Sequence, residues 1–445
     1  MTLTNRKIFH VQRSVCMPVI LLAMIALQAC SFGPLTRNEP LQLPRQPIDH
    51  VETHVFSVDP GDSVVGELAT VPVKEDDTFS DLARHFGLGL QQVTNANPGI
   101  DPWIPEAGQK VLLPTQFILP DAPRKGLVIN LATMRLFHFP GTKSSQVHTY
   151  PVGIGREGRA SPMGTMTVDR KTPNPTWYVP ESIRRDHAKK GDPLPAIVSP
   201  GPDNPLGEFA MYLSRPSYLI HGTNKPFSIG LRASNGCIRL YPEDIRVLFK
   251  DVKEKSQVRI VNQPYLVGQS GPKVYLEAHE PHEELDAKQV RAALNAKLKQ
   301  IEKKQGIKLD WAKIDQVVKD ARGLPVPVTE HSDSIADLSS HALALDHPGR
   351  LNGQPEPVRG DADAWYVRAI ETKSQNDAEK MAAMLNHMGP RIPARAVDKG
   401  DMFEVLAGPY SDAKAAKLAA KQLKIEMEIA ADVVAPARSQ KLTLR

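Results

Sequence analysis

Cysteine is scarce in this sequence, which has Cys16, Cys30 and Cys237 and no other among 445 residues. A domain held together by disulfides needs more cysteines, and the C-x-x-C spacing typical of structural zinc sites does not occur. Disulfide scaffolds and cysteine-ligated metal centres are therefore excluded. Each of the three cysteines needs a separate explanation.

The sequence also lacks a large excess of positive or negative charge and, after its N-terminal segment, long apolar runs. The net charge of +5 is small for this length, and no Lys/Arg run is interleaved with aromatic residues, which argues against a nucleic-acid surface. A mildly basic protein can still adhere to an anionic polymer. Beyond residue 30, no apolar run approaches the ~18 residues of a membrane-spanning helix. The 39 prolines collect in a few stretches, which predicts several domains joined by linkers.

The N-terminal segment has the pattern of an export signal. Residues 1–29 begin with three basic residues and continue with an apolar stretch too short to span a bilayer. The sequence Leu-Gln-Ala-Cys that ends at Cys30 resembles the lipobox of bacterial lipoproteins, which implies cleavage before Cys30 and membrane attachment by a lipid on its sulfur. Gln28 is a less common residue in that motif, so plain signal cleavage stays an alternative. Cys16 is removed with the signal, and once Cys30 carries its lipid, Cys237 is the free thiol of the mature chain.

Residues 30–65 are Pro-rich and lack periodicity, which predicts a tether. Residues 66–115 read as a strand, two short helices and a closing strand, with Phe79, Leu82 and Phe86 on one helix face. This unit resembles a LysM module, which implies a β-α-α-β fold that binds glycan strands containing N-acetylglucosamine. An arbitrary small α/β cap is the alternative. The resemblance rests on D-D-T-F at 76–79, L-A at 82–83, F-G at 86–87, N-A-N-P at 95–98 and G-Q-K at 108–110.

Residues 124–262 are rich in strand patterns separated by glycine turns, which predicts an antiparallel sandwich or barrel. Within them Cys237 follows Ser-Asn-Gly, and His221 precedes Gly-Thr. A thiol is a poor nucleophile until an imidazole or a positive charge lowers its pKa, and His221, Arg232 and Arg239 are the candidates. Amides around Cys237 could form an oxyanion hole. Taken alone, an inert core thiol is the alternative.

The whole pattern resembles the catalytic motif of the L,D-transpeptidases, the YkuD family. The matching segments are H-G-T at 221–223, I-G-L-R-A-S at 229–234, G-C-I-R-L at 236–240 and, upstream, Y-P-V-G-I-G at 150–155. The resemblance implies a mainly β sandwich with Cys237 as nucleophile and His221 as base. The carbonyl of Gly222 would orient the imidazole, and Arg239 would support the site by charge or hydrogen bonding. It implies no metal and no cofactor.

One position departs from the family pattern. Many members have His two residues before the cysteine, where this chain has Asn235, beside Gly236. We expect Asn235 to donate a hydrogen bond to the oxyanion, which would alter the rate without abolishing activity. Further residues expected to contact substrate are Tyr212, Tyr218, Thr223 and Ser234. For the two tyrosines a packing role is an equal alternative.

The resemblance implies a reaction on peptidoglycan. Cys237 attacks the diaminopimelate carbonyl of a tetrapeptide stem, releases D-Ala and transfers the acyl group to an amine. The acceptor is another stem or a lysine of an envelope lipoprotein. One alternative is an L,D-carboxypeptidase or endopeptidase, in which water resolves the thioester. Another is a non-catalytic protein that anchors a membrane to the wall, against which an activated Cys/His pair argues.

Residues 263–323 predict a hairpin and two amphipathic helices, and the polar, Pro-rich residues 324–360 predict a flexible linker. Residues 361–436 have a β-α-β-β-α-β pattern. W-Y-V at 365–367 and F-E-V-L-A-G-P-Y at 403–410 resemble the SPOR domain, which implies binding to denuded glycan strands and enrichment at division sites. RNA-binding modules share this topology, but their basic-aromatic strand signature is missing. We therefore expect a multidomain periplasmic protein held at the outer membrane by its lipid.

Two motifs lack the context that their usual chemistry requires. G-I-G-R-E-G at 153–158 has the spacing of a nucleotide-binding loop, but no helical pattern follows, so we predict a β-turn. H-E-P-H at 279–282 is one residue short of H-E-x-x-H and contains Pro281, so we predict a solvated loop in place of a zinc site.

Overall fold

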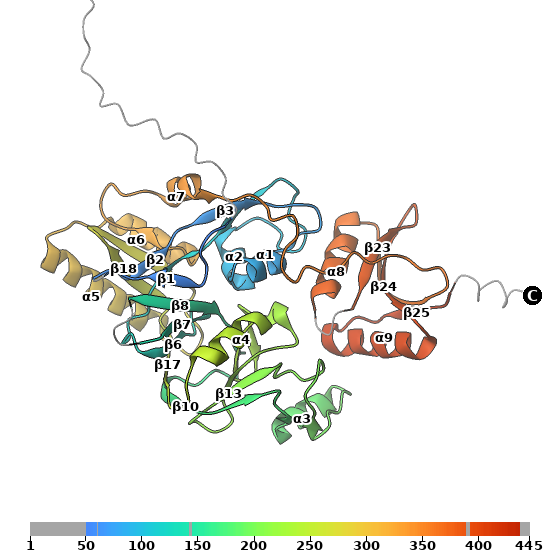
Figure 1. Ribbon diagram of the computed structural model, residues 1–445. Helices are drawn as coiled ribbons and strands as arrows, with labels where there is room; N and C mark the ends of the chain where they lie inside the picture. Colours follow the sequence, from blue (N-terminus) through green and yellow to red (C-terminus); the bar gives the residue numbers. More distant parts are fainter. Residues whose placement is uncertain (1–49, 60, 142–144, 389–391, 437–445) are drawn as a thin grey trace, which may run out of the picture. The chain divides into compact units, whose positions relative to one another are not determined.

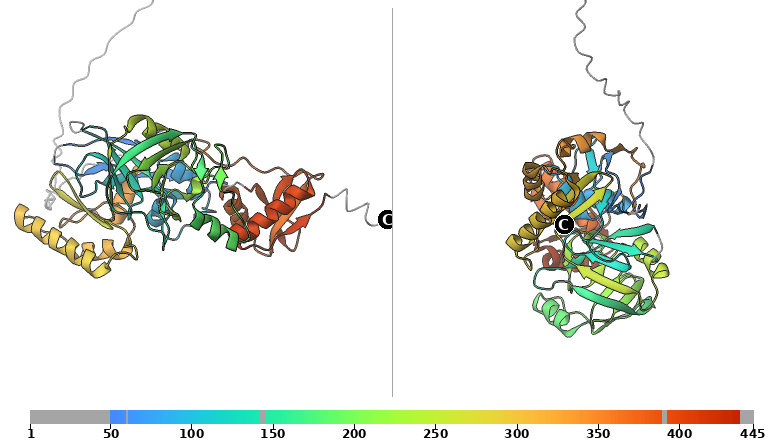
Figure 2. Two further views of the ribbon diagram at one scale, coloured as in Figure 1. Left: turned by 90° about the horizontal axis from the view of Figure 1, so that it is seen from below. Right: turned by 90° about the vertical axis from the view of Figure 1, so that its left-hand side faces the viewer.

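The computed structural model describes residues 50–59, 61–141, 145–388 and 392–436 (Figures 1 and 2). The expected signal segment and Cys30 lie outside these residues. Within them, no helix is both long and apolar enough to cross a membrane.

The central β unit is mainly β, as predicted, and is built around one nine-stranded sheet. In sheet order the strands are β1 (Val55–Ser57), β8 (Gln146–Pro151), β7 (Arg135–Phe139), β6 (Gly126–Asn130), β17 (Gln257–Val261), β10 (Gly164–Pro173), β13 (Phe209–Leu213), β14 (Leu219–His221) and β16 (Ile238–Arg239). The pairs β6–β17 and β14–β16 run parallel because long crossovers join them, so the sheet is mixed where an antiparallel one was expected.

Shorter elements complete this unit. They are the strand pairs β9 (Ile154–Gly155) with β15 (Arg232–Ser234) and β11 (Trp177–Tyr178) with β12 (Ile197–Val198), the helices α3 (Glu181–Lys189) and α4 (Pro242–Asp251), and the 3-10 turn η1 (Pro226–Ser228). Residues 157–158 form the turn predicted for the glycine-rich motif, and Gly158 has a positive φ of 70°.

One end of the sheet is covered on both faces. Alternate residues of β6, Leu127 and Ile129, pack with α4, whereas Val128 faces a second core on the opposite side. Strand β7 repeats the pattern with Leu136 on one face and Phe137 on the other, and all five residues are almost fully buried. Because side chains alternate along a strand, covering both faces explains the continuous apolar runs in this part of the sequence.

The LysM-like unit has the predicted order β3 (Ala69–Pro72), α1 (Phe79–His85), α2 (Leu90–Ala96) and β4 (Lys110–Leu113). Helix α1 begins in a capping box, in which Thr78 Oγ1 accepts from the Asp81 amide and the Asp81 carboxylate accepts from the Thr78 amide. Asn97 ties the end of α2 to β4, because its Nδ2 donates to the Leu112 carbonyl and its Oδ1 accepts from the Leu112 amide, both at 2.8 Å.

The LysM-like unit and the central β unit share one hydrophobic core, which includes Phe79 of α1 and Phe137 of β7. At its edge, Arg84 donates two hydrogen bonds to the Glu243 carboxylate, at 2.8 and 3.0 Å. Such bidentate pairs fix relative orientation as well as distance. The two units therefore pack as parts of one folded body.

The predicted tether, residues 30–65, ends earlier than expected. Strand β1 pairs with β8, and β2 (Val64–Gly66) pairs with β5 (Gln116–Ile118). Phe56 and Val65 are buried in the shared core, which gives these short segments a reason to be ordered.

Residues 263–323 form the predicted hairpin and helices: β18 (Tyr265–Ser270), β19 (Lys273–Ala278), α5 (Ala287–Gln305) and α6 (Trp311–Asp320). Asp286 and Asp310 cap the two helices, and Gly306 ends α5 in the left-handed conformation. Leu294 and Leu298 of α5 pack in one cluster with residues of β19 and α6.

The prediction of a flexible linker over residues 324–360 is wrong. This segment contains β20 (Val326–Pro327), which pairs with β19, then α7 (Ile335–His341), and β21 (Leu343–Ala344), which pairs with β3. Leu345 and Leu351 are buried in the shared core. The average composition is polar, but a few well-spaced leucines reach a core that other segments form.

The C-terminal unit has the predicted β-α-β-β-α-β order. Its elements are β22 (Trp365–Thr372), α8 (Gln375–His387), β23 (Ala394–Asp398), β24 (Phe403–Tyr410), α9 (Ala413–Met427) and β25 (Asp432–Val434). The antiparallel sheet has the order β23-β24-β22-β25, and both helices cover one face of it (Figure 2). The side chains of Ser374 and Asp412 cap the two helices.

We expect Leu351→Ala to lower the free energy of unfolding by about 2–5 kcal/mol, because the truncation leaves a cavity in the shared core. Leu351 is 2% exposed. Leu418→Ala is the matched control, since Leu418 on α9 is 67% exposed and its truncation should cost less than about 0.5 kcal/mol. Denaturant unfolding of the whole protein measures both. Equal transitions for the two variants would contradict the packing of residues 324–360.

Candidate active site

Strands β14 and β16 bring Cys237 and His221 to the same side of the sheet. In their parallel register Ile220 lies opposite Ile238, and His221 lies opposite Arg239. Cys237 directly precedes β16, and because side chains alternate along strands it shares a face with Arg239 and His221. Residues far apart in the sequence therefore meet on two adjacent strands.

The loop before Cys237 is closed by its own hydrogen bonds. Ser234 Oγ donates to the Cys237 carbonyl at 2.6 Å and accepts from the Gly236 amide at 3.1 Å. Gly236 has a φ of +106°, and a Cβ on it would lie 2.8 Å from the Tyr218 ring, so only glycine fits here. Ser234 is 2% exposed, and its hydroxyl is used inside the loop. This geometry suits a positioning residue better than the predicted substrate contact.

The His221 ring has the carbonyl contact that the sequence predicts. Its Nδ1 lies 2.6 Å from the Gly222 carbonyl oxygen. Since a carbonyl only accepts, this bond assigns the proton to Nδ1 and leaves Nε2 with a free lone pair. Burial, aided by the charge of Arg239, lowers the pKa of His221 to about 3 and outweighs the Gly222 bond, which raises it. The imidazole is therefore neutral over the physiological range.

The thiol of Cys237 differs from the expectation of a lowered pKa. Burial raises its pKa, and the opposing effects of the Leu219 backbone and the Arg239 charge are smaller. Arg232, one of the expected sources of positive charge, is instead paired with Glu283 and with Glu284, the latter at 3.1 Å. The resting site thus holds a neutral thiol and a neutral imidazole, and the thiol needs a base at the moment of attack.

Arg239 is a half-buried cation with few partners. Its Nη1 lies 3.4 Å from Ser228 Oγ, and its Nε has no hydrogen-bond partner among the described residues. Burial lowers its pKa, and the Cys237 thiolate would raise it. A cation left this sparsely compensated favours negative charge nearby.

The remaining predicted residues lie close to this strand pair in different settings. Asn235 is exposed, and its Oδ1 accepts from Arg156 at 3.3 Å. Thr223 is buried, and its hydroxyl accepts from the Lys225 amide at 3.0 Å, which fixes a turn. Tyr212 lies opposite Leu219 in the sheet.

Residues 215–218 contribute a contact that the sequence did not reveal. The carbonyl of Ser217 accepts from Cys237 Sγ at 3.7 Å, and Ser217 has a φ of +71°, which is uncommon for a residue other than glycine. Its Pro-Ser sequence signals a turn, but nothing in it indicates that the turn meets the thiol.

A polar cavity of about 350 Å³ lies between α2 and the segment that leads to Cys237. Among its lining residues are Gln92, Asn95, Arg232, His279, His282 and Arg322. His279, the first residue of the H-E-P-H segment, is buried, so the prediction of a solvated loop is wrong at this position. Its Nε2 lies 2.8 Å from Oε1 of Glu277 in β19, so this imidazole already has a carboxylate partner.

Three domain families match the chain. The L,D-transpeptidase catalytic domain matches residues 124–260, the LysM domain residues 72–114 and the SPOR domain residues 361–435. The catalytic domain thus stands between a LysM and a SPOR domain, in the predicted order.

Related proteins carry the same family name. The probable L,D-transpeptidase ErfK/SrfK of Escherichia coli is 45% identical over 226 residues, which are 50% of this chain and 72% of that protein. The probable L,D-transpeptidase YcfS of the same organism is 39% identical over 285 residues, 62% of this chain and 88% of that protein. The solved catalytic domain of the E. faecium L,D-transpeptidase is 19% identical, with a TM-score of 0.25, over 32% of this chain and 99% of that chain. From the sequence comparisons, the chain belongs to the L,D-transpeptidase family.

Proposed function

We propose that this protein acts on peptidoglycan as a cysteine acyltransferase. Cys237 attacks the diaminopimelate carbonyl of a tetrapeptide stem, D-Ala leaves, and an amine takes the acyl group. The supporting observation is that His221, with Nδ1 held by the Gly222 carbonyl, lies on the strand next to Cys237 and on the same face. The LysM and SPOR domains support glycan strands of the wall as the binding partner.

The proton transfers of the reaction start from a neutral Cys237 thiol and a neutral His221 imidazole. As Sγ bonds to the carbonyl carbon, its proton passes to Nε2 of His221, which acts as general base. The imidazolium then protonates the nitrogen of D-Ala as the C–N bond breaks, leaving a thioester on Cys237. An acceptor amine attacks this thioester, gives its proton to His221, and the thiol is restored when the imidazolium returns that proton to sulfur.

The oxyanion donors come from the loop that holds Cys237. The Gly236 amide is already bound by Ser234, so we assign the Cys237 amide to the developing negative charge. Asn235 can add its side-chain N–H group, because its Oδ1 is held by Arg156 and the amide nitrogen is left for substrate. The positive charge of Arg239 supports the same build-up of negative charge on substrate and sulfur.

We expect Cys237→Ala and Cys237→Ser to abolish thioester formation and to leave the fold intact, because Sγ is the nucleophile. Intact-mass spectrometry after incubation with a tetrapeptide donor measures the adduct, which is the donor less D-Ala. Leu418→Ala, at an exposed position, is the control and should form the wild-type adduct. An adduct on the alanine variant would place the nucleophile elsewhere.

The pH dependence tests His221. Because its pKa is lowered to about 3, the neutral base form is present above that value, and activity is lost only as the pH falls through it. We therefore expect kcat/KM to stay level between about pH 5 and 7, with no inflection near the ordinary imidazole pKa of about 6.5. His221→Ala should lower kcat/KM by roughly 10²–10⁴ throughout this range. A wild-type inflection near pH 6.5, with circular dichroism unchanged, would show that a different or protonated imidazole controls the reaction.

The acceptor is the amine of a second stem or of a lysine in an envelope lipoprotein. We place the reaction in the periplasm, with the protein held at the outer membrane through Cys30 and gathered at division sites by its SPOR domain. Muropeptide mass spectrometry of cells with wild-type protein or Cys237→Ala separates the acceptors. Stem-to-stem crosslinks or protein-linked stems should disappear in the variant. Loss of tripeptide stems alone would identify water as the acceptor and overturn transfer to an amine.

A further inference from the structure

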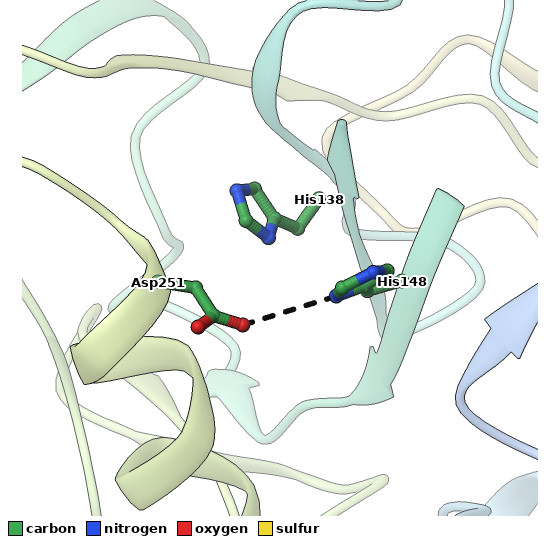
Figure 3. Close-up of side chains that lie close together, drawn as sticks. All are labelled: His138, His148 and Asp251. Carbon is green, nitrogen blue, oxygen red and sulfur yellow. Dashed lines mark ion pairs between the residues drawn. The ribbon is translucent and has the colours of Figure 1, made fainter. Parts of the chain in front are cut away.

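His138 and His148 face each other across neighbouring strands. They are direct partners in the antiparallel register of β7 and β8, so their side chains leave the same face of the sheet. Asp251, the last residue of α4, completes a group in which one ligand atom from each side chain lies within 4.8 Å of the others (Figure 3). The shortest carboxylate contact joins Asp251 Oδ2 to His148 Nδ1, at 3.9 Å.

One ring nitrogen of the buried His138 lacks a hydrogen-bond partner among the described residues. The residue is 5% exposed, and its Nδ1 has no hydrogen-bond partner among the described residues. In Figure 3 this ring nitrogen is on the side of the imidazole that faces Asp251 and His148. A buried polar atom without a hydrogen-bond partner is energetically costly, so such groups normally have one.

The charges around the group favour a cation. A histidine binds a metal ion in its neutral form, so two such ligands and one carboxylate make a donor set with a net charge of −1. The ammonium of Lys171 already contacts the carbonyls of Phe249 and Val252 at this helix end. Those carbonyls already have a partner, and the Asp251 carboxylate is the group at this helix end that faces the imidazoles.

We propose that His138, His148 and Asp251 bind a divalent transition metal of the zinc class, with water in the fourth position. Nitrogen and oxygen ligands lie about 2.0–2.2 Å from zinc, so the present spacing must close by roughly 1 Å. The side chain of Asp251 is 40% exposed and can make this movement by rotation, while the strand pairing holds the two histidines.

The proposed role of the metal is structural. In sheet order, β7 and β8 stand at the opposite end from β14 and β16, which bear the Cys237 site. The metal would clamp the C-terminus of α4 to β7 and β8. Because α4 begins shortly after β16, it would stabilise the element that follows the nucleophile.

Cobalt titration of the tag-free protein, followed by calorimetry and by the visible Co²⁺ spectrum, tests the site. We expect one Co²⁺ per chain with a tetrahedral spectrum, and a higher Tm when Zn²⁺ is added. His148→Gln and Asp251→Asn should each weaken binding by at least ~10-fold and remove the Tm increase. Their partly exposed positions allow the fold to be retained.

His187→Gln is the matched control, because His187 on α3 forms a comparable pair with Asp192 at 3.0 Å and lies outside the group. This variant should bind like wild type. Absence of wild-type binding at millimolar Co²⁺ would overturn the proposal. Equal binding by wild type, His148→Gln and Asp251→Asn would also overturn it, since the metal would then sit on other histidines.

Discussion

The guanidinium of Arg135 is buried where the LysM domain meets the catalytic domain, and the arrangement of both depends on it. It donates to the Gly87 carbonyl at 2.8 Å and to Thr149 Oγ1 at 3.0 Å, and it lies 3.8 Å from the centre of the Phe117 ring. Burial lowers its pKa to about 9. A buried charge is tolerated only when its partners stay in place. The LysM turn at Gly87 and strand β8 must therefore form together, which couples the folding of the two domains.

The LysM domain also contacts the segment that leads to Cys237. The Leu90 amide donates to the Ile229 carbonyl at 3.2 Å, and a Cβ on Gly230 would lie 2.4 Å from the Cα of Gly89. No larger residue fits at that crossing. The segment held there continues into β15 and the loop of Cys237, so the LysM domain supports the strand that carries the proposed chemistry. A glycan bound by that domain would then have a fixed relation to the stem peptide at Cys237, and positioning of this kind raises rates without new catalytic groups.

Local patterns predicted much of the fold and which residues stand near Cys237, and long-range contacts account for what they missed. The helices of the LysM and SPOR domains follow from apolar spacing and from caps such as Thr78 and Asp412. The pairing of Cys237 with His221 came from motif similarity. The pKa of Cys237 depends on burial, which no motif encodes, and so its direction was missed. The prediction of a flexible linker over residues 324–360 was wrong for a related reason. Leu351 packs in a core that segments distant in the sequence build, and the local composition does not reveal this.

The SPOR domain is joined to the LysM domain by polar contacts that a flexible linker would not supply. His387 Nε2 lies 2.9 Å from the Asp81 carboxylate, the same group that caps helix α1, and Lys380 contacts Asp101 at 2.6 Å. Two glycan-binding modules on a flexible linker gain avidity that depends on linker length. Modules held by side-chain contacts gain it only when the spacing of their sites matches that of the glycan strands. Because residues 324–360 are packed, the avidity of the two modules would depend on the fixed distance between their binding sites and not on the length of a linker.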